Sequence, residues 1–147
     1  MRTFGNIIWH IPYLGFMSAF GVFIMGILMI LTIIGAPVGF GLLQLSKFLL
    51  TPFSCAMVDK KDANIEDNSI WKSLNTIARI LYFPFGLFIS IMLIVQIVLM
   101  FVSLIGIPVA IVMSKSLSTY FNPVNKVCIS KELYDEIMGK KVTGDIA

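Results

Sequence analysis

Thr32-Ile33-Ile34-Gly35-Ala36-Pro37-Val38 closes a long uncharged stretch, and the pattern returns later in the chain as Ser103-Leu104-Ile105-Gly106-Ile107-Pro108-Val109. Glycine is common where a helix ends or where two backbones approach closely. Proline two residues later lacks a backbone donor and clashes with the preceding helical turn. The sequence therefore predicts a helix break at Gly35 and Pro37, and a second at Gly106 and Pro108.

Both breaks lie at the ends of apolar stretches that are long enough to cross a bilayer. No Asp, Glu, Lys or Arg occurs between Arg2 and Lys47, or between Arg79 and Lys115. A spanning helix needs only about 20 apolar residues. The chain is 58% hydrophobic and 13% charged, whereas soluble domains carry about 25% charged residues. We therefore predict an all-α integral membrane protein.

A shift of 71 positions superposes the two halves of the chain. It places Gly35 on Gly106, Pro37 on Pro108 and Pro52 on Pro123. Internal repeats are a common route to membrane folds. We predict two tandem repeats, each a long transmembrane helix with a Gly-x-Pro break followed by a short interfacial or re-entrant helix. The single membrane domain, 1–147, then divides into repeat one (3–58), a polar connector (59–72), repeat two (73–129) and a C-terminal surface helix and tail (130–147).

The local pattern also predicts the individual elements. Residues 3–12 read as a short interfacial helix, and the apolar run from Tyr13 to Ile34 reads as the first spanning helix. Residues 38–50 would cover about two thirds of a bilayer core, so we expect this helix to lie at the interface or to re-enter. In the tail we expect a helix that Ser130 caps and Gly139 terminates.

One succession of features occurs twice in the chain: a long apolar helix, a Gly-x-Pro-Val turn, a short amphipathic stretch and then Pro-Phe or Pro-Val. This succession resembles the YccF family, also called the inner membrane component domain. The resemblance extends over nearly the whole chain, and it implies a multi-pass protein of the bacterial inner membrane whose activity is not established. The residues that carry it are Asn6, Trp9, 33–39, Lys47, Pro52-Phe53, Leu74-Asn75, 105–109 and Pro123-Val124. After the second proline the family continues with glycine and a basic residue, whereas this chain has Ser54-Cys55 and Asn125-Lys126.

Residues able to support chemistry are few. A single histidine, His10, excludes a multi-histidine metal site, and the acidic connector lacks the order and central glycine of a calcium loop. No nucleotide-binding glycine loop or serine-nucleophile elbow occurs. The sequence predicts no enzyme, no cofactor and no metal. Cys55 and Cys128 are expected to be free cytoplasmic thiols, because two cysteines do not make a disulfide framework.

The net charge of +3 points to lipid rather than to nucleic acid. The basic residues flank apolar runs, where they face anionic lipid headgroups. We therefore expect the lipid bilayer as a partner and no nucleic acid.

Polar residues inside the apolar runs are the candidates for oligomer or pore contacts. The hydroxyls of Thr32 and Ser103 can bond back to the carbonyls of Leu28 and Leu99, which satisfies bent helix ends; the alternative is a role in permeation. Gln96 needs a partner in the middle of a spanning run, and we expect another helix or another subunit. In an oligomer, the Lys47 and Lys115 segments would ring the axis.

The number of crossings stays open at this point. If each repeat crosses once, the basic residues divide almost evenly between the two sides, and their distribution does not set the orientation. If the chain crosses back after each break, all basic residues fall on one side, but Lys47 and Lys115 follow Pro37 and Gly106 by only 10 and 9 residues and would sit deep. Both arrangements keep the termini together. We lean to two spanning helices with cytoplasmic termini.

Two hypotheses for function follow. In the first, the chain is a homo-oligomeric membrane component that forms a pore for ions or small solutes. In the second, it is a non-conducting anchor or scaffold that presents its connector and C-terminal helix to a partner protein.

Overall fold

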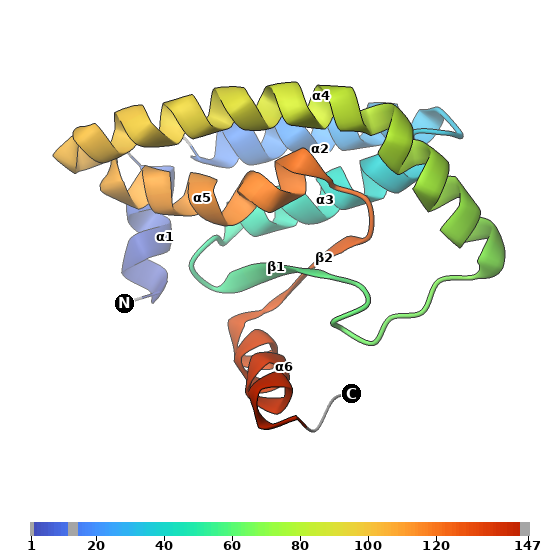
Figure 1. Cartoon of the computed structure of the whole chain (residues 1–147). Coiled ribbons are helices and arrows are strands. Elements are labelled where there is room, and N and C mark those ends of the chain that lie inside the picture. The colour runs from blue at the N-terminus through green and yellow to red at the C-terminus, as the bar shows by residue number, and fades with distance from the viewer. Residues whose placement is uncertain (1, 12–14, 145–147) are drawn as a thin grey trace.

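The computed structural model describes residues 2–11 and 15–144, which form a layer of helices above a short two-stranded ribbon (Figure 1). The described elements in chain order are α1 (Arg2–His10), α2 (Gly15–Leu31), α3 (Ala36–Leu50), β1 (Cys55–Asp59), α4 (Ser69–Val102), the 3-10 helix η1 (Leu104–Gly106), α5 (Ile107–Phe121), β2 (Lys126–Ser130) and α6 (Lys131–Thr143). The chain is therefore mostly helical, as predicted, although the two strands were not expected.

Each Gly-x-Pro break turns the chain back on itself, so that α2 packs along α3 and α4 packs along α5. The tips of these two helical hairpins point to opposite ends of the molecule (Figure 1). This return is compatible with the predicted interfacial or re-entrant helices and also with a chain that crosses back, so the number of crossings stays a prediction.

Of the two predicted long spanning helices, the second is found as α4, and the first is shorter than predicted. Within residues 2–11 and 15–144, α4 has the length and apolar composition to span a bilayer, and its most apolar window is only 11% buried. Helix α2 ends at Leu31, three residues before the predicted end, and has 17 residues. It lies at 79° to α1. The predicted helix start at Tyr13 lies outside the described residues.

Helix α4 bends in Figure 1, and its first third descends toward the connector. Pro84 lies inside the helix, where it removes the hydrogen bond to the carbonyl of Ile80. The helix therefore begins at Ser69, inside the segment 59–72 predicted as the polar connector. The connector observed between β1 and α4 spans residues 60–68.

The core lies between α3, α5 and the ribbon. Leu45 and Phe48 of α3 and Val112 of α5 are fully buried, and they belong to one cluster with Val124 and Cys128. Gln44 Oε1 accepts a hydrogen bond from the backbone N–H of Cys128 at 3.1 Å. Helices α3 and α5 are thus fixed directly on the strands.

The ribbon pairs one strand from each half of the chain. β1 and β2 are antiparallel, and Met57 faces Cys128 at the central position. These two residues are 71 positions apart, which is also the shift that superposes the halves in sequence. The hydrogen bonds at the two ends of the ribbon are related by the same shift of 71 positions. Lys60 N–H donates to Asn125 O at 2.8 Å, and the equivalent Lys131 N–H donates to Ser54 O at 3.0 Å.

The two breaks also have the same backbone geometry. Gly35 has φ −81° and ψ −8°, and Gly106 has φ −79° and ψ −7°. A Cβ atom at Gly35 would lie 2.8 Å from the carbonyl oxygen of Met29, and one at Gly106 would lie 2.6 Å from that of Met100. Both glycines are therefore required by close approach rather than by an unusual φ.

The C-terminal helix was predicted correctly at its start but not at its end. Ser130 Oγ accepts a hydrogen bond from Leu133 N–H, as expected of an N-cap. Gly139 lies inside α6 and does not terminate it. Gly144 ends the helix instead, because its φ of 77° supplies the left-handed C-cap.

Candidate functional site

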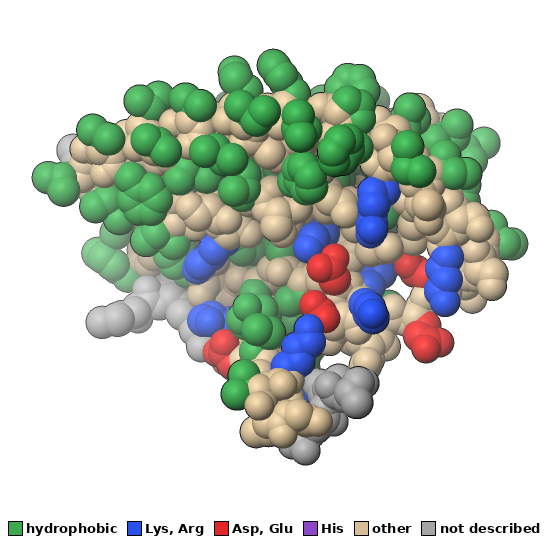
Figure 2. Space-filling view, in the orientation of Figure 1, with side chains coloured by type: hydrophobic (Ala, Val, Ile, Leu, Met, Phe, Trp, Pro, Cys, Tyr) green, Lys and Arg blue, Asp and Glu red, His purple; other side chains and the backbone are tan. Residues whose placement is uncertain are grey.

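Apolar side chains cover α4 and both hairpin tips, whereas the charged side chains gather on the opposite side of the molecule (Figure 2). At the tips, Ile33 is 81% exposed and Leu104 is 83% exposed. Neither α2 nor the part of α4 after Arg79 contains a charged residue. The molecule therefore has one apolar side and one polar side.

The predicted break residues lie at the hairpin tips. Pro37 and Pro108 each occupy the first turn of the returning helix, where the missing backbone donor costs no hydrogen bond. Gly35 and Gly106 come immediately before α3 and α5 as their N-cap residues. These four residues shape the tips, and nothing around them provides a polar site.

Thr32 and Ser103 contribute to the ends of α2 and α4. Thr32 Oγ1 donates to Met29 O at 2.7 Å, and not to Leu28 as we expected, because the last turn before the break is tightened. At Ser103 the backbone N–H donates to Leu99 O at 3.3 Å. Both residues therefore satisfy helix carbonyls.

Lys47 and Lys115 lie toward the ribbon. Lys115 Nζ is 5.1 Å from the centre of the Phe53 ring, just before β1. The charge of Lys47 acts on the thiol of Cys128 in β2. Because α3 and α5 rest on the strands, both lysines reach the polar side, although each follows a break closely. They do not lie deep in the apolar layer, which was the objection to a returning chain.

Gln96 lies exposed on the apolar surface of α4. It has no hydrogen bond within the described part of the chain, and its neighbours Met92, Val95 and Leu99 are exposed as well. The partner that we expected for Gln96 is therefore not found within one chain.

The connector is tied to α4 and to the ribbon by polar side chains. Asp67 accepts from Lys60 Nζ and from Asn75 Nδ2, each at 3.0 Å. Asn75 Nδ2 also donates to Asn125 Oδ1 at 2.6 Å. Asn75 is only 6% exposed, and its loss would remove the donor from one oxygen each of the half-buried Asp67 and Asn125.

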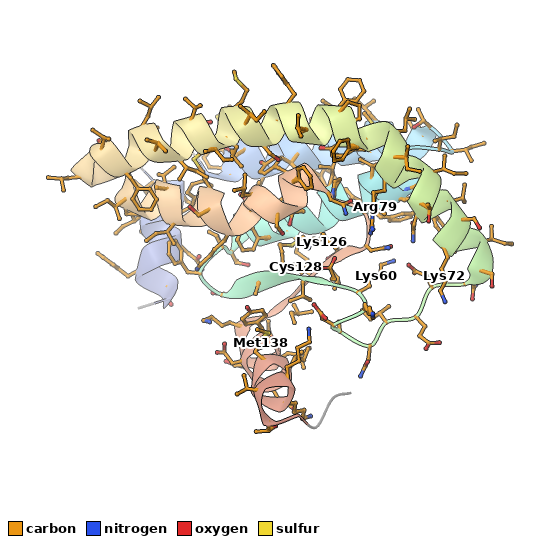
Figure 3. All side chains as sticks on the ribbon, in the orientation of Figure 1. Lys60, Lys72, Arg79, Lys126, Cys128 and Met138 are labelled. Atoms are coloured by element: carbon orange, nitrogen blue, oxygen red, sulfur yellow. The ribbon has the colours of Figure 1, made fainter. Side chains whose placement is uncertain are left out.

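A polar cavity of about 830 Å³ lies between the connector, the first third of α4 and the end of α5. Figure 3 shows Lys60, Lys72, Arg79 and Lys126 around this region, below the bend of α4. Lys60 pairs with Asp67 and Lys126 with Asp59, at 3.0 and 3.1 Å. The other cations that line the cavity are Lys61, Lys72 and Arg79, and the remaining carboxylates are Asp62, which pairs with Lys141, and Glu66.

An apolar cavity of about 710 Å³ lies between α2, α3 and α4. Met25 and Met29 line it from α2, and Leu81 and Phe85 line it from α4. Leu81 and Phe85 are themselves exposed, so the cavity is a groove that opens at the apolar surface.

The two cysteines are free thiols, as predicted, and both lie in the ribbon. Burial raises the pKa of the Cys128 thiol to about 12, and the neighbouring Cys55 adds to this shift. In residues 2–11 and 15–144, no three His, Cys, Asp or Glu side chains gather in a group that could hold a metal ion.

Comparison with known proteins finds a match over the first third of the chain. Residues 4–54 match YccF, the inner membrane component domain. No curated protein and no solved structure matches the chain. The YccF match spans α1, α2 and α3 and stops just before β1. It supports a membrane protein; the resemblance of the second half to YccF stays a prediction.

The polar residues of the YccF match fix α1 against the end of α3. Asn6 Oδ1 accepts from Phe53 N–H, and Asn6 Nδ2 donates to Ser54 Oγ, both at 3.1 Å. Trp9 Nε1 donates to Leu49 O at 2.8 Å. In the other half, Asn75 bonds Asn125 and Tyr82 Oη donates to Tyr120 O at 3.1 Å. Ser54 and Leu49 are 71 positions before Asn125 and Tyr120.

Sequence reasoning did not single out Lys72 and Arg79. The signal was present, because seven residues on a helix make two turns and place both side chains on one face. What was missing was the position of the connector, which folds back to form the other wall of the cavity.

Proposed function

We propose that this chain is a non-conducting membrane scaffold, inserted into one leaflet of the bacterial inner membrane from the cytoplasmic side, which presents its polar side to a partner protein. The observation that carries this proposal is the separation of the surface into an apolar side, with apolar hairpin tips, and a polar side that contains the ribbon, the connector and α6.

The dimensions of the apolar layer suit a single leaflet. A helix with its side chains is about 10–12 Å thick, and half of the hydrocarbon core is about 15 Å. Helices α2 and α4 both lie on the side away from the ribbon (Figure 1). Lying flat, this one layer of helices fills most of one leaflet.

A spanning orientation would be costly for one chain. The charged residues lie beside the hairpins and not beyond their tips, so hairpins parallel to the membrane normal would carry the ribbon and connector into hydrocarbon. A charged side chain at the bilayer centre costs about 2.5–3.5 kcal/mol or more. The exposed Ile33 and Leu104 at the tips would in turn enter water.

The basic residues favour a cytoplasmic polar side. The described lysines and Arg79 all lie on the polar side or next to it. They belong to the ribbon, the connector, α6, the first third of α4, or helices α3 and α5, which rest on the strands. Positive charge near membrane segments is retained in the cytoplasm. The described parts of both terminal helices, α1 and α6, extend below the helix layer, so we propose cytoplasmic termini.

Helix α6 is the surface best suited to a partner. It has no buried residue, and it contacts the rest of the chain through the two strands and through the ion pair between Lys141 and Asp62 of the connector. Met138 and Val142, one turn apart, are 42% and 86% exposed (Figure 3). An exposed apolar pair on a charged helix is a candidate anchor for another protein.

Labelling of single cysteines tests the one-leaflet insertion. In a chain with Cys55→Ala and Cys128→Ala, cysteines are introduced at Ile33, Leu104 or Lys140. A membrane-impermeant maleimide should label none of them in intact cells, and only the Lys140→Cys variant should react in inverted vesicles. Labelling of Ile33→Cys or Leu104→Cys from the periplasm would show that the hairpins cross, and would refute the proposal.

Variants of α6 test the scaffold role. Chemical crosslinking in cells should join the full chain to a reproducible partner, and Met138→Glu should abolish that adduct without removing the chain from the membrane. Lys131→Gln, at the start of the same helix, is the matched control. If the adduct survives Met138→Glu and also survives truncation after Ser130, α6 is not the presenting surface.

A second candidate function is the homo-oligomeric pore, and the exposed Gln96 favours it. An amide that faces lipid without a partner is unfavourable, and bonding to a second copy would satisfy it. In mild detergent, the wild-type chain should then be oligomeric and Gln96→Leu should shift it toward the monomer. Ion flux in liposomes would support conduction; its absence at every oligomeric state would exclude a pore.

We propose, in addition, that the two halves arose by internal duplication and that the chain is not an enzyme. The register of the ribbon and the equivalent breaks support the first statement. The second is supported by the lack, among residues 2–11 and 15–144, of an acid and a base that meet at the apolar layer. A catalytic activity that depends on Asp67 or Glu66 would contradict it.

A further inference from the structure

The polar cavity and the apolar groove share a border. Arg79 and Phe121 line the polar cavity, whereas Ala78, Tyr82 and Tyr120 line the apolar groove. Ala78, Arg79 and Tyr82 lie on neighbouring turns of α4, and Tyr120 and Phe121 are consecutive at the end of α5. A ligand that passes this turn would therefore meet cationic side chains at one end and hydrocarbon side chains at the other.

The polar cavity carries unneutralised positive charge. Lys61, Lys72 and Arg79 have no ion pair among residues 2–11 and 15–144, and Glu66 is the one lining carboxylate without a cationic partner there. Lys72 and Arg79 lie on one face of α4, about 10 Å apart along its axis. Three cations against one carboxylate make this cavity suitable for an anion.

The groove has the opposite character. Side chains from α2, α3 and α4 line it, and it opens on the side that we place in lipid. Its volume of about 710 Å³ is sufficient for an acyl chain. Gly21 lies in its wall, and a Cβ atom at this position would meet nothing within 4 Å, so space is free beside it.

We propose that this chain binds an anionic phospholipid, with the phosphate held by Lys72 and Arg79 and one acyl chain lying in the groove between α2 and α4. Zwitterionic lipids carry a compensating ammonium group and should bind less well. A soluble phosphate compound would satisfy the cations but leave the groove empty. The site rests on the membrane location of the chain, and its test in detergent does not depend on the one-leaflet insertion.

Native mass spectrometry of the full chain in mild detergent can measure this binding. The probes are phosphatidylglycerol and phosphatidylcholine with the same acyl chains, and glycerol 3-phosphate as the soluble headgroup. We expect phosphatidylglycerol to bind at least tenfold more tightly than either of the others. Equal binding of phosphatidylcholine would overturn the role of the cations, and equal binding of glycerol 3-phosphate would indicate a free phosphate site instead of a lipid site.

Three variants separate the two ends of the site. Lys72→Gln with Arg79→Gln should weaken phosphatidylglycerol binding about 30-fold, since each cation near the membrane surface contributes about fivefold. Lys131→Gln with Lys140→Gln removes the same charge outside the cavity and should change binding less than twofold. Gly21→Leu should weaken binding of the lipid without affecting glycerol 3-phosphate. If the control pair weakens binding as much as the cavity pair, the attraction is nonspecific and the site is refuted.

Discussion

Gly41 provides the sharpest test of how the two halves of the chain fit together. It lies in α3, where an added Cβ atom would come 1.8 Å from the carbonyl oxygen of Pro123 and 2.5 Å from its carbonyl carbon. Pro123 is fully buried in the turn between α5 and β2. Replacing Gly41 by alanine should therefore push α3 away from this turn.

The expected cost follows from two opposing effects. Cβ atoms essentially never approach other atoms within 3.0 Å, so the two backbones must separate by at least about 1.2 Å. Such overpacking costs about 1–3 kcal/mol, and the upper end applies because both partners are backbone. Alanine stabilises a helix by about 1 kcal/mol relative to glycine. We expect Gly41→Ala to lower the free energy of unfolding by about 1–2 kcal/mol.

Gly21→Ala is the matched control, because Gly21 lies in α2 and its added Cβ would meet nothing within 4 Å. This variant should be neutral or up to about 1 kcal/mol more stable. Unfolding by sodium dodecyl sulfate in mixed micelles, followed by circular dichroism, measures both variants against the wild-type chain. If Gly41→Ala and Gly21→Ala agree within about 0.5 kcal/mol, the close approach of α3 to Pro123 is not present in the folded protein.

Three further predictions use the same unfolding measurement. Thr119→Val should stabilise the protein by about 1 kcal/mol, because the Thr119 hydroxyl is fully buried without a hydrogen-bond partner in the described chain; a loss of stability would reveal a partner. Trp9→Phe should cost about 1–3 kcal/mol, because it leaves the Leu49 carbonyl without its donor; an unchanged midpoint would contradict this bond. Burial raises the pKa of the Cys128 thiol to about 12, so the unfolded thiol ionises first as the pH rises, and stability should fall between about pH 9 and 12. Cys128→Ala should reduce that fall, and an identical pH profile would refute this contribution.

The helix breaks could be predicted because their causes are local. In a Gly-x-Pro segment the proline removes a backbone donor and clashes with the preceding turn, which are local effects, and the turn 32–35 and η1 lie where the repeated pattern placed them. Ser130 could be recognised as a cap for the same reason. Gly139 was misjudged because glycine is tolerated inside an exposed helix, where it costs only about 1 kcal/mol.

The strands could not be predicted because their cause is not local. Cys55–Asp59 and Lys126–Ser130 are five-residue segments without a clear alternating pattern, and each forms a strand because the other half of the chain supplies its partner. The polar cavity likewise forms only when segments far apart in the sequence come together. Lys72 and Arg79 could be placed on one helix face from sequence, but the connector that encloses them becomes visible only once its bonds to Asn75 and Asn125 are known.

The register of the ribbon bears on the two candidate functions. The antiparallel pairing centred on Met57 and Cys128 gives the ribbon a local two-fold axis, and the two hairpins lie on one side of the ribbon with their tips pointing apart. Cys128 packs there in one cluster with Phe48 and Val112, so the centre of the chain is closed by side chains. Any conducting path must therefore run between copies, along the exposed surface of α4. Conduction and self-association through Gln96 thus stand or fall together: a Gln96→Leu chain that is monomeric and still passes ions would exclude this route, whereas loss of both would favour the pore over the scaffold.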